Sequence, residues 1–207
     1  MLITVSREYG AGGSEVARRV ADALGWRLVD NELLERVAAR AGISPEEMAG
    51  IEERTPSFIE RLARVLATST PELFPPPTGT VAELSEATLV RITEAVVEEA
   101  ARDGRAVLVG RAAPAVLARE RDALHVRLVA SRAFRIRTTV ERLGLDPKEA
   151  ERIMVQTDAQ RERYHREHYA RAWADPVGYH LVINTERLGY DGAAAVIVAE
   201  AKRRGWR

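Results

Sequence analysis

The stretch that decides the fold runs from residue 2 to residue 17 and reads LITVSREYGAGGSEVA. An apolar run is followed by a glycine-rich turn, and the turn opens a helix at Glu15. Glycines let backbone N–H groups turn inward, and a helix N-terminus adds a partial positive charge. The stretch therefore predicts a phosphate-binding loop after a buried strand. A tight turn made only for packing is the structural alternative.

This loop departs at one position from the usual phosphate-binding pattern, G-x-x-x-x-G-K-[ST]. Gly12, Gly13 and Ser14 fit the end of the pattern, but Gly13 lies where the lysine is expected. That lysine normally makes a charge-assisted contact worth about 1.5–3 kcal/mol. Arg7, Arg18 or an arginine from a lid could supply the charge instead. Ser14 keeps the position that usually holds Mg²⁺.

The composition excludes several other classes of protein. The chain has 207 residues, of which 46% are apolar and 30% are charged, as in a globular protein with one good-sized core. Lys+Arg and Asp+Glu are both 31, so no net charge attracts the chain to nucleic acid or membrane. The absence of cysteine excludes thiolate metal sites and cysteine nucleophiles.

Neither a signal peptide nor an apolar run of membrane-spanning length is recognised in the sequence, so we expect a cytoplasmic protein without a membrane partner. Histidines 125, 165, 168 and 180 do not form a metal-binding pattern. The segment from His165 to His168 is expected on the surface.

Five apolar runs alternate with predicted helices along the chain. They lack strict alternation of apolar and polar residues, which is typical of a parallel sheet buried on both faces. We therefore predict an α/β fold: a three-layer α/β/α domain of the P-loop type, with a five-stranded parallel sheet and ligands beyond the carboxyl ends of the strands. The predicted strands are residues 2–5, 27–29, 106–109, 124–129 and 180–183, and helices are expected at 15–24, 112–117, 131–142, from 146 onward and at 192–204.

Two segments are longer than plain connections between parallel strands require, namely about residues 31–100 and 145–172. Insertions of this size are usually lids or substrate-binding subdomains. We expect one domain over residues 1–207 that carries the first segment as a helical insert and the second as a lid. The long helix predicted from about 80 to 103 is explained equally well by packing in a homodimer and by packing within the insert.

Charged residues near the strand ends are the next candidates. Asp158 and Arg161 lie one helical turn apart, and Arg163 lies on another side of the same polar helix. Such spacing fits a solvated helix with internal ion pairs, and it also fits a lid that brings guanidinium groups to a transferring phosphoryl group. Arg111 directly follows a buried strand and a glycine, which favours an anion or a carboxylate as its partner. Asp30 follows the second strand.

Together these residues resemble the cytidylate kinase-like family, within the nucleoside monophosphate kinases of the P-loop class, over nearly the whole chain. Residues 3–14 are similar to the loop of a variant branch that lacks the P-loop lysine. Leu28-Val29-Asp30 with Arg36 resembles the strand and helix that hold the base and phosphate of the acceptor. The stretches that begin at Arg91 and at Gly110 resemble segments with phosphate-binding arginines, and Asp158 to Arg163 resembles the lid motif.

The resemblance implies a nucleoside monophosphate kinase-type phosphotransferase that moves the γ-phosphoryl group of ATP to a nucleoside monophosphate, with CMP or dCMP as first candidates. It implies ATP and Mg²⁺ as cofactors and nucleotides, rather than a nucleic acid polymer, as partners. The implied residues are Arg7, Gly10, Ala11, Gly12, Gly13 and Ser14 for ATP, with Ser14 also for Mg²⁺; Asp30, Arg36, Arg91 and Arg111 for the acceptor; and Asp158, Arg161 and Arg163 for catalysis. A nucleotide-binding or sensing protein with weak catalysis, and a kinase for another small acceptor, remain as alternatives.

Overall fold

The computed structural model describes residues 1–30, 90, 94, 97–102 and 104–206. The chain divides into two compact units, Met1–Val29 with Val97–Arg207, and Asp30–Val96. Most of the predicted insert, about residues 31–100, lies outside the described residues, so its helical structure stays a prediction. The sheet and the glycine-rich loop belong to the first unit.

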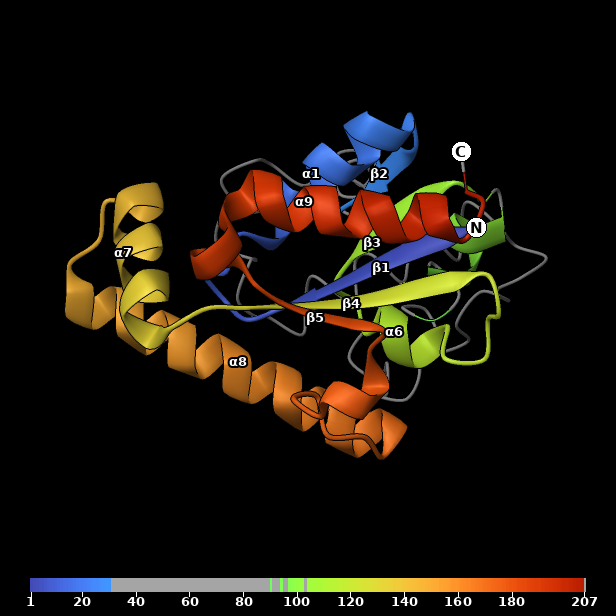
Figure 1. Cartoon of the computed structure of the whole chain (residues 1–207). Coiled ribbons are helices and arrows are strands. Elements are labelled where there is room, and N and C mark those ends of the chain that lie inside the picture. The colour runs from blue at the N-terminus through green and yellow to red at the C-terminus, as the bar shows by residue number, and fades with distance from the viewer. Residues whose placement is uncertain (31–89, 91–93, 95–96, 103, 207) are drawn as a thin grey trace, which may run out of the picture. The chain divides into compact units, whose positions relative to one another are not determined.

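The first unit is built on a five-stranded sheet in which every pair of neighbouring strands runs parallel (Figure 1). The strands are β1 (Leu2–Arg7), β2 (Arg27–Val29), β3 (Ala106–Val109), β4 (Ala123–Val129) and β5 (Leu181–Asn184). Their order is β2-β3-β1-β4-β5, so all five predicted strands are confirmed, with small changes at their ends. The chain first adds β2 and β3 on one side of β1 and then adds β4 and β5 on the other side. Ligands of open α/β sheets bind at such a switch in direction, beyond the carboxyl ends of the strands.

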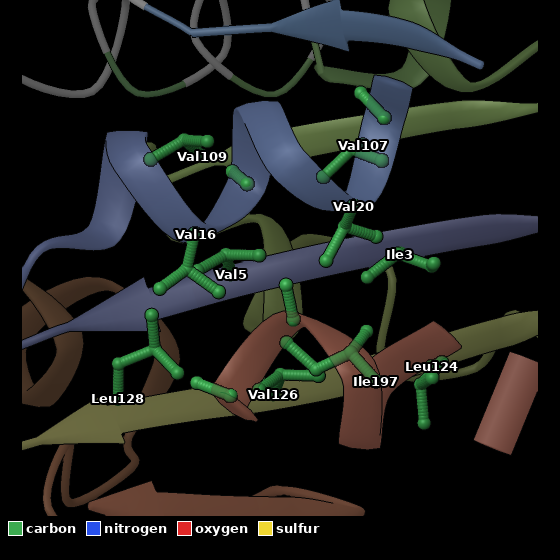
Figure 2. Close-up of a cluster of buried hydrophobic side chains, with 14 of the residues drawn as sticks. Ile3, Val5, Val16, Val20, Val107, Val109, Leu124, Val126, Leu128 and Ile197 are labelled. Atoms are coloured by element: carbon green, nitrogen blue, oxygen red, sulfur yellow. The ribbon is translucent and has the colours of Figure 1, made fainter. Parts of the chain in front are cut away.

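One face of the sheet packs against α1 (Gly13–Leu24) and α9 (Thr185–Arg203). Figure 2 shows Val16 and Val20 of α1 and Ile197 of α9 gathered with alternate residues of β1, among them Ile3 and Val5. All five of these side chains are fully buried. Burial of one such side chain stabilises a fold by roughly 1.5–3 kcal/mol, so this layer holds α1 firmly on the sheet.

The opposite face of the sheet has a smaller apolar cluster and several buried polar groups. Leu2 and Leu108 pack there with Val97 and with Ala113 of α6 (Ala113–Val116). Thr4, Ser6, His125 and Arg127 are buried as well, on the strand positions between the apolar ones. Both faces of β4 are thus buried, as predicted for a parallel sheet covered on both sides, although His125 and Arg127 are polar.

Two helices follow β4. Ser131 caps α7 (Arg132–Leu143) by accepting a hydrogen bond from the N–H of Phe134, and Asp146 caps α8 (Pro147–Tyr169) by accepting from Lys148 and Glu149. Both starts agree with the prediction, because serine and aspartate are strong N-cap residues. The segment predicted as a lid, residues 145–172, corresponds closely to α8. Its role as a lid stays a prediction.

The closing helix begins earlier than predicted. Asn184, rather than a residue near Gly192, caps α9 by accepting a hydrogen bond from the N–H of Arg187. Gly189 has non-helical angles, φ 67° and ψ 170°, and separates a first turn from the rest of the helix. The sequence prediction found only the longer second part. None of the helices in the described part of the chain is long and apolar enough to span a membrane.

Candidate phosphate-binding site

The glycine loop connects the end of β1 to the start of α1. Gly10 and Gly12 have φ angles of 79° and 77°, in the left-handed region that glycine adopts without strain. Gly12 is the N-cap residue of α1 and has no side chain that could accept hydrogen bonds from the first helical turn. The first N–H groups of α1 are therefore open to an external acceptor, and the helix dipole favours an anion.

Two threonines from other helices hold the loop in place. Thr138 of α7 donates a hydrogen bond of 2.8 Å to the carbonyl oxygen of Gly10. Thr185, at the start of α9, donates one of 2.9 Å to the carbonyl oxygen of Ala11, which is fully buried. The loop is thus a supported structure between α7 and α9, as a preorganised binding site requires.

The side chain of Arg7 runs beside two glycines. A Cβ atom added to Gly13 would lie 2.5 Å from Cγ and 2.9 Å from Cδ of Arg7. A Cβ atom added to Gly110, directly after β3, would lie 2.2 Å from Nη1 of Arg7. The methylene groups of Arg7 therefore lie over Gly13 and its guanidinium group over Gly110. Arg7 connects the carboxyl ends of the neighbouring strands β1 and β3.

Asp158 links α8 to the loop. Its Oδ1 accepts a hydrogen bond of 2.9 Å from the N–H of Tyr9, and its Oδ2 lies 2.5 Å from Nη1 of Arg135. Arg161, one turn further along α8, lies 3.3 Å from the same carboxylate and donates a hydrogen bond of 2.9 Å to the carbonyl oxygen of Arg7. The structure thus brings Asp158, Arg161 and Arg7 together at one end of the sheet.

Arg161 is a partly buried cation, with 23% of its side chain exposed, next to a second cation. Burial, followed by the charge of Arg7, lowers the pKa of Arg161 to about 9. The guanidinium group still carries its charge at neutral pH, so two positive charges lie close together at a partly buried place. An anion at this place would stabilise both.

Sequence reasoning missed three charged residues of this site. Arg127 of β4 is 3% exposed, donates a hydrogen bond of 2.9 Å to the carbonyl oxygen of Trp173 and lies 3.9 Å from Glu8. Arg135 of α7 lies 3.5 Å from the other carboxylate oxygen of Glu8. The signal for Arg127 is the alternation of polar and apolar residues in the middle of β4, where His125 and Arg127 are the polar ones. The sequence carries no comparable signal for Glu8 or Arg135.

The remaining predicted residues of the first unit have different surroundings. Arg163 is 66% exposed and pairs with Glu167 at 3.3 Å, which fits the solvated-helix interpretation. Arg111 is exposed and, with Ala112, has a positive φ. Such backbone costs about 1–2 kcal/mol per residue and is common at functional turns. Ser14 is exposed in the first turn of α1.

The predicted acceptor residues of the second unit are mostly beyond the description. Asp30 follows β2 directly, and Arg36 and Arg91 lie outside the described residues. The surface position expected for residues 165–168 is wrong for His165, which is 7% exposed. Over the described ranges no three or more histidine and acidic side chains gather in a way that could hold a metal ion.

A parallel sheet of this strand order, with a glycine loop between its central strand and the following helix, defines the P-loop kinase fold. The chain belongs to the cytidylate kinase-like family, whose sequence profile matches residues 2–187. No curated protein sequence matches it significantly.

Among the solved structures that are similar over nearly the whole chain, two show the likeness in fold. An uncharacterized protein from Eubacterium ventriosum has 20% identity and a TM-score of 0.66, with 98% of each chain covered. Shikimate kinase from Bacteroides thetaiotaomicron has 13% identity and a TM-score of 0.55, again with 98% of each chain covered. At these identities the likeness concerns the fold alone.

Proposed function

We propose that the protein is a phosphotransferase that moves the γ-phosphoryl group of ATP to a nucleoside monophosphate, with CMP or dCMP as the first acceptors to test. The observation that carries the proposal is the position of Arg7 and Arg161 beside the glycine loop, at the carboxyl end of β1, in a member of the cytidylate kinase-like family. Positive charge next to open backbone N–H groups is what a polyphosphate requires.

The backbone from Gly10 to Ser14 is the proposed cradle for the donor phosphates. Its left-handed glycines and the first turn of α1, which has no side-chain cap, fit a phosphate group, because backbone N–H groups can bind its oxygens there. The exposed hydroxyl of Ser14 makes no hydrogen bond to another described residue and fits a Mg²⁺ ligand. Mg²⁺ bound with ATP supplies charge neutralisation at the phosphate oxygens.

In the proposed reaction an anionic oxygen of the acceptor phosphate forms a bond to the γ-phosphorus. The bond from that phosphorus to the bridging oxygen breaks, and ADP leaves with the electron pair. The attacking oxygen is already ionised, so no strong base is needed. Arg161 is held in place by Asp158 and by the carbonyl oxygen of Arg7, where it stabilises the charge on the transferring group. We assign Arg163 to the same role after movement of α8.

The acceptor side is proposed to use Asp30, Arg36, Arg91 and Arg111. Of these, Arg111 has the clearest structural support. It follows Gly110, against which the guanidinium group of Arg7 lies, and its backbone is held in a conformation that arginine rarely adopts. A turn of this kind at the end of β3 is a common place for a ligand-binding residue in parallel sheets.

The test combines binding and turnover. Thermal unfolding with ATP·Mg²⁺, ADP and a panel of nucleoside monophosphates measures binding, and a coupled assay with the same acceptors measures ADP formation. We expect stabilisation by ATP and acceptor-dependent ADP formation with at least one pyrimidine monophosphate. Stabilisation without transfer would instead support a nucleotide sensor. ADP formation only with a non-nucleotide acceptor would support another kinase, and a folded protein with neither response would overturn nucleotide binding.

A further inference from the structure

Compared with the common phosphate loop, the glycine and the cationic residue have changed places between positions 7 and 13 of this chain. The eight positions of the pattern G-x-x-x-x-G-K-[ST] fall on residues 7–14 of this chain. The first position is usually glycine and is Arg7 here, whereas the seventh is usually lysine and is Gly13 here. The loop has therefore not simply lost a cation. A cation stands at its first position instead of its seventh.

In the structure, the side chain of Arg7 occupies the space that a side chain at residue 13 would need, so the two replacements are linked. Gly13 is buried and lies in α1 with ordinary backbone angles, so its backbone does not require glycine. The requirement comes from Arg7, because a Cβ atom on Gly13 would lie 2.5 Å from Cγ of Arg7. Real Cβ atoms do not come so close to another carbon. The side chain of Arg7 passes through the space that any larger residue at position 13 would need.

The guanidinium group of Arg7 also lies beside a glycine, Gly110. Gly110 leaves room for the guanidinium group at the carboxyl end of β3, where a Cβ atom would lie 2.2 Å from Nη1 and 3.1 Å from Cζ. The backbone of Arg7 is held by Arg161, which donates a hydrogen bond of 2.9 Å to its carbonyl oxygen. The backbone of Arg7 is thus held in place, its methylene groups lie against the first turn of α1, and its guanidinium group lies at Gly110.

We propose that Arg7 takes the role of the P-loop lysine and binds the β- and γ-phosphates of the donor nucleotide, and that Gly13 is glycine in order to let Arg7 pass. This inference rests on the proposed function. Arginine presents a planar pair of donors to a phosphate, whereas lysine is a point charge, so the exchange conserves charge and changes geometry. It follows that lysine introduced at residue 13 alone does not repair the loop, since it collides with Arg7.

The claim that Gly13 must be glycine because of Arg7 is tested by measuring stability without nucleotide. Gly13→Ala is expected to lower the unfolding temperature by several degrees in the wild-type background. In an Arg7→Gly background the same change is expected to be neutral or stabilising, because alanine is the better helix residue. Gly192→Ala in α9 is the matched control: it is helical, its nearest contact is an ordinary 3.4 Å from Leu188, and its effect should not depend on residue 7. An equal effect of Gly13→Ala in both backgrounds would overturn the coupling.

The proposed role of Arg7 in phosphate binding is tested by calorimetry, which measures the affinities for ATP·Mg²⁺ and for AMP. Arg7→Met keeps methylene groups over Gly13 and removes the charge. It is expected to weaken ATP binding by about 10- to 100-fold, as loss of one charge-assisted contact does, while AMP binding changes little. Arg7→Lys should retain part of the affinity. Arg203→Met is the control, because Arg203 is 74% exposed, pairs with Glu200 in the last turn of α9 and lies outside the proposed site.

The double variant Arg7→Gly with Gly13→Lys restores the common pattern and should recover ATP binding that Gly13→Lys alone loses. If wild-type protein binds ATP and Arg7→Met binds it equally well, the role of Arg7 is overturned and the proposed function stands. If the wild-type protein binds no nucleotide, the proposed function is overturned and the role of Arg7 falls with it. Circular dichroism spectra confirm that each variant is folded.

Discussion

Gly12 and Gly25 stand at the two ends of α1 and differ in their surroundings. Both have left-handed backbone, with φ angles of 77° and 65°. A Cβ atom on Gly12 would lie 2.3 Å from Cε1 of Tyr190, which reaches the loop from α9. Nothing lies within 4 Å of the corresponding position on Gly25. Backbone angle alone requires glycine at residue 25, whereas at residue 12 the ring of Tyr190 adds a second reason.

Comparison of Gly12→Ala with Gly25→Ala separates these two reasons. Gly25→Ala is expected to cost about 1 kcal/mol, the usual penalty for alanine in left-handed backbone. Gly12→Ala is expected to cost about 1–3 kcal/mol more, because the ring of Tyr190 must move. Urea unfolding of the two variants gives the difference. Equal costs would show that Tyr190 yields freely and does not fix the loop.

At the scale of elements, α8 is attached to the loop chiefly through Asp158. This carboxylate is the common partner of the N–H of Tyr9, of Arg135 from α7 and of Arg161 from α8. It is 19% exposed, so water replaces these contacts poorly. Arg161 is therefore held beside the loop by this one negative charge together with its hydrogen bond to the carbonyl oxygen of Arg7.

Asp158→Asn keeps the size of this side chain and removes its charge. We expect a loss of about 1–3 kcal/mol in the free energy of unfolding, since Arg161 and Arg135 each lose a charged partner and Arg135 keeps only Glu8 among the described residues. Glu149→Gln is the matched control on the same helix, where a more exposed carboxylate pairs with Arg152 at 2.6 Å, and should cost less than about 1 kcal/mol. Chemical denaturation of both variants provides the measurement. A loss no larger for Asp158→Asn than for the control would contradict the anchoring role.

The elements themselves were largely predictable. Apolar runs, helix caps such as Ser131 and Asp146, and the end of α1 at Gly25 are local signals, and the structure confirms the elements that they predicted. The start of α9 was missed because its first turn is followed by a break at Gly189 and has little apolar periodicity. Asn184 is a local cap signal, but no apolar pattern follows it before the break at Gly189.

The site was predictable only where a residue follows a recognisable strand or motif. The glycine loop, Arg7 and Arg161 were found in this way and lie together in the structure. Glu8, Arg127 and Arg135 were missed because they come from separate segments whose meeting depends on the tertiary fold. Arg163 was assigned by the same motif as Arg161, but helical geometry places it on an exposed side of α8.

At the scale of the whole molecule, two buried histidines make stability depend on pH. His125 lies 2.8 Å from Oγ1 of Thr4 within the sheet, and His165 is buried in α8. Burial lowers the pKa of each to about 4, helped by His180 for His125 and by Arg127 for His165. Between pH 4 and the ordinary value of 6.5, the unfolded chain binds protons that the folded protein does not.

This difference has a definite sign. The stability contributed by neutral His125 and His165 is complete above about pH 6.5 and is lost as the pH falls toward 4, by about 1–2 kcal/mol for each histidine between about pH 7 and pH 5. Urea unfolding at these two pH values measures the loss. His125→Gln cannot bind the proton and should reduce the loss by its own share. An unchanged loss in this variant would show that His125 is protonated without cost in the folded protein.

The passage of Arg7 over Gly13 and Gly110 bears on how such loops can be found from sequence. A search that demands lysine before the serine passes over this chain, although the backbone of the loop is complete. The contacts of Arg7 with Gly13 and Gly110 define a different search pattern. It is R-x-x-G-x-G-G-[ST] at the end of the first strand, together with a glycine directly after the neighbouring strand, which is β3 in this chain. Chains that satisfy both conditions are expected to lack the lysine for one shared reason, which is that their arginine already occupies its place.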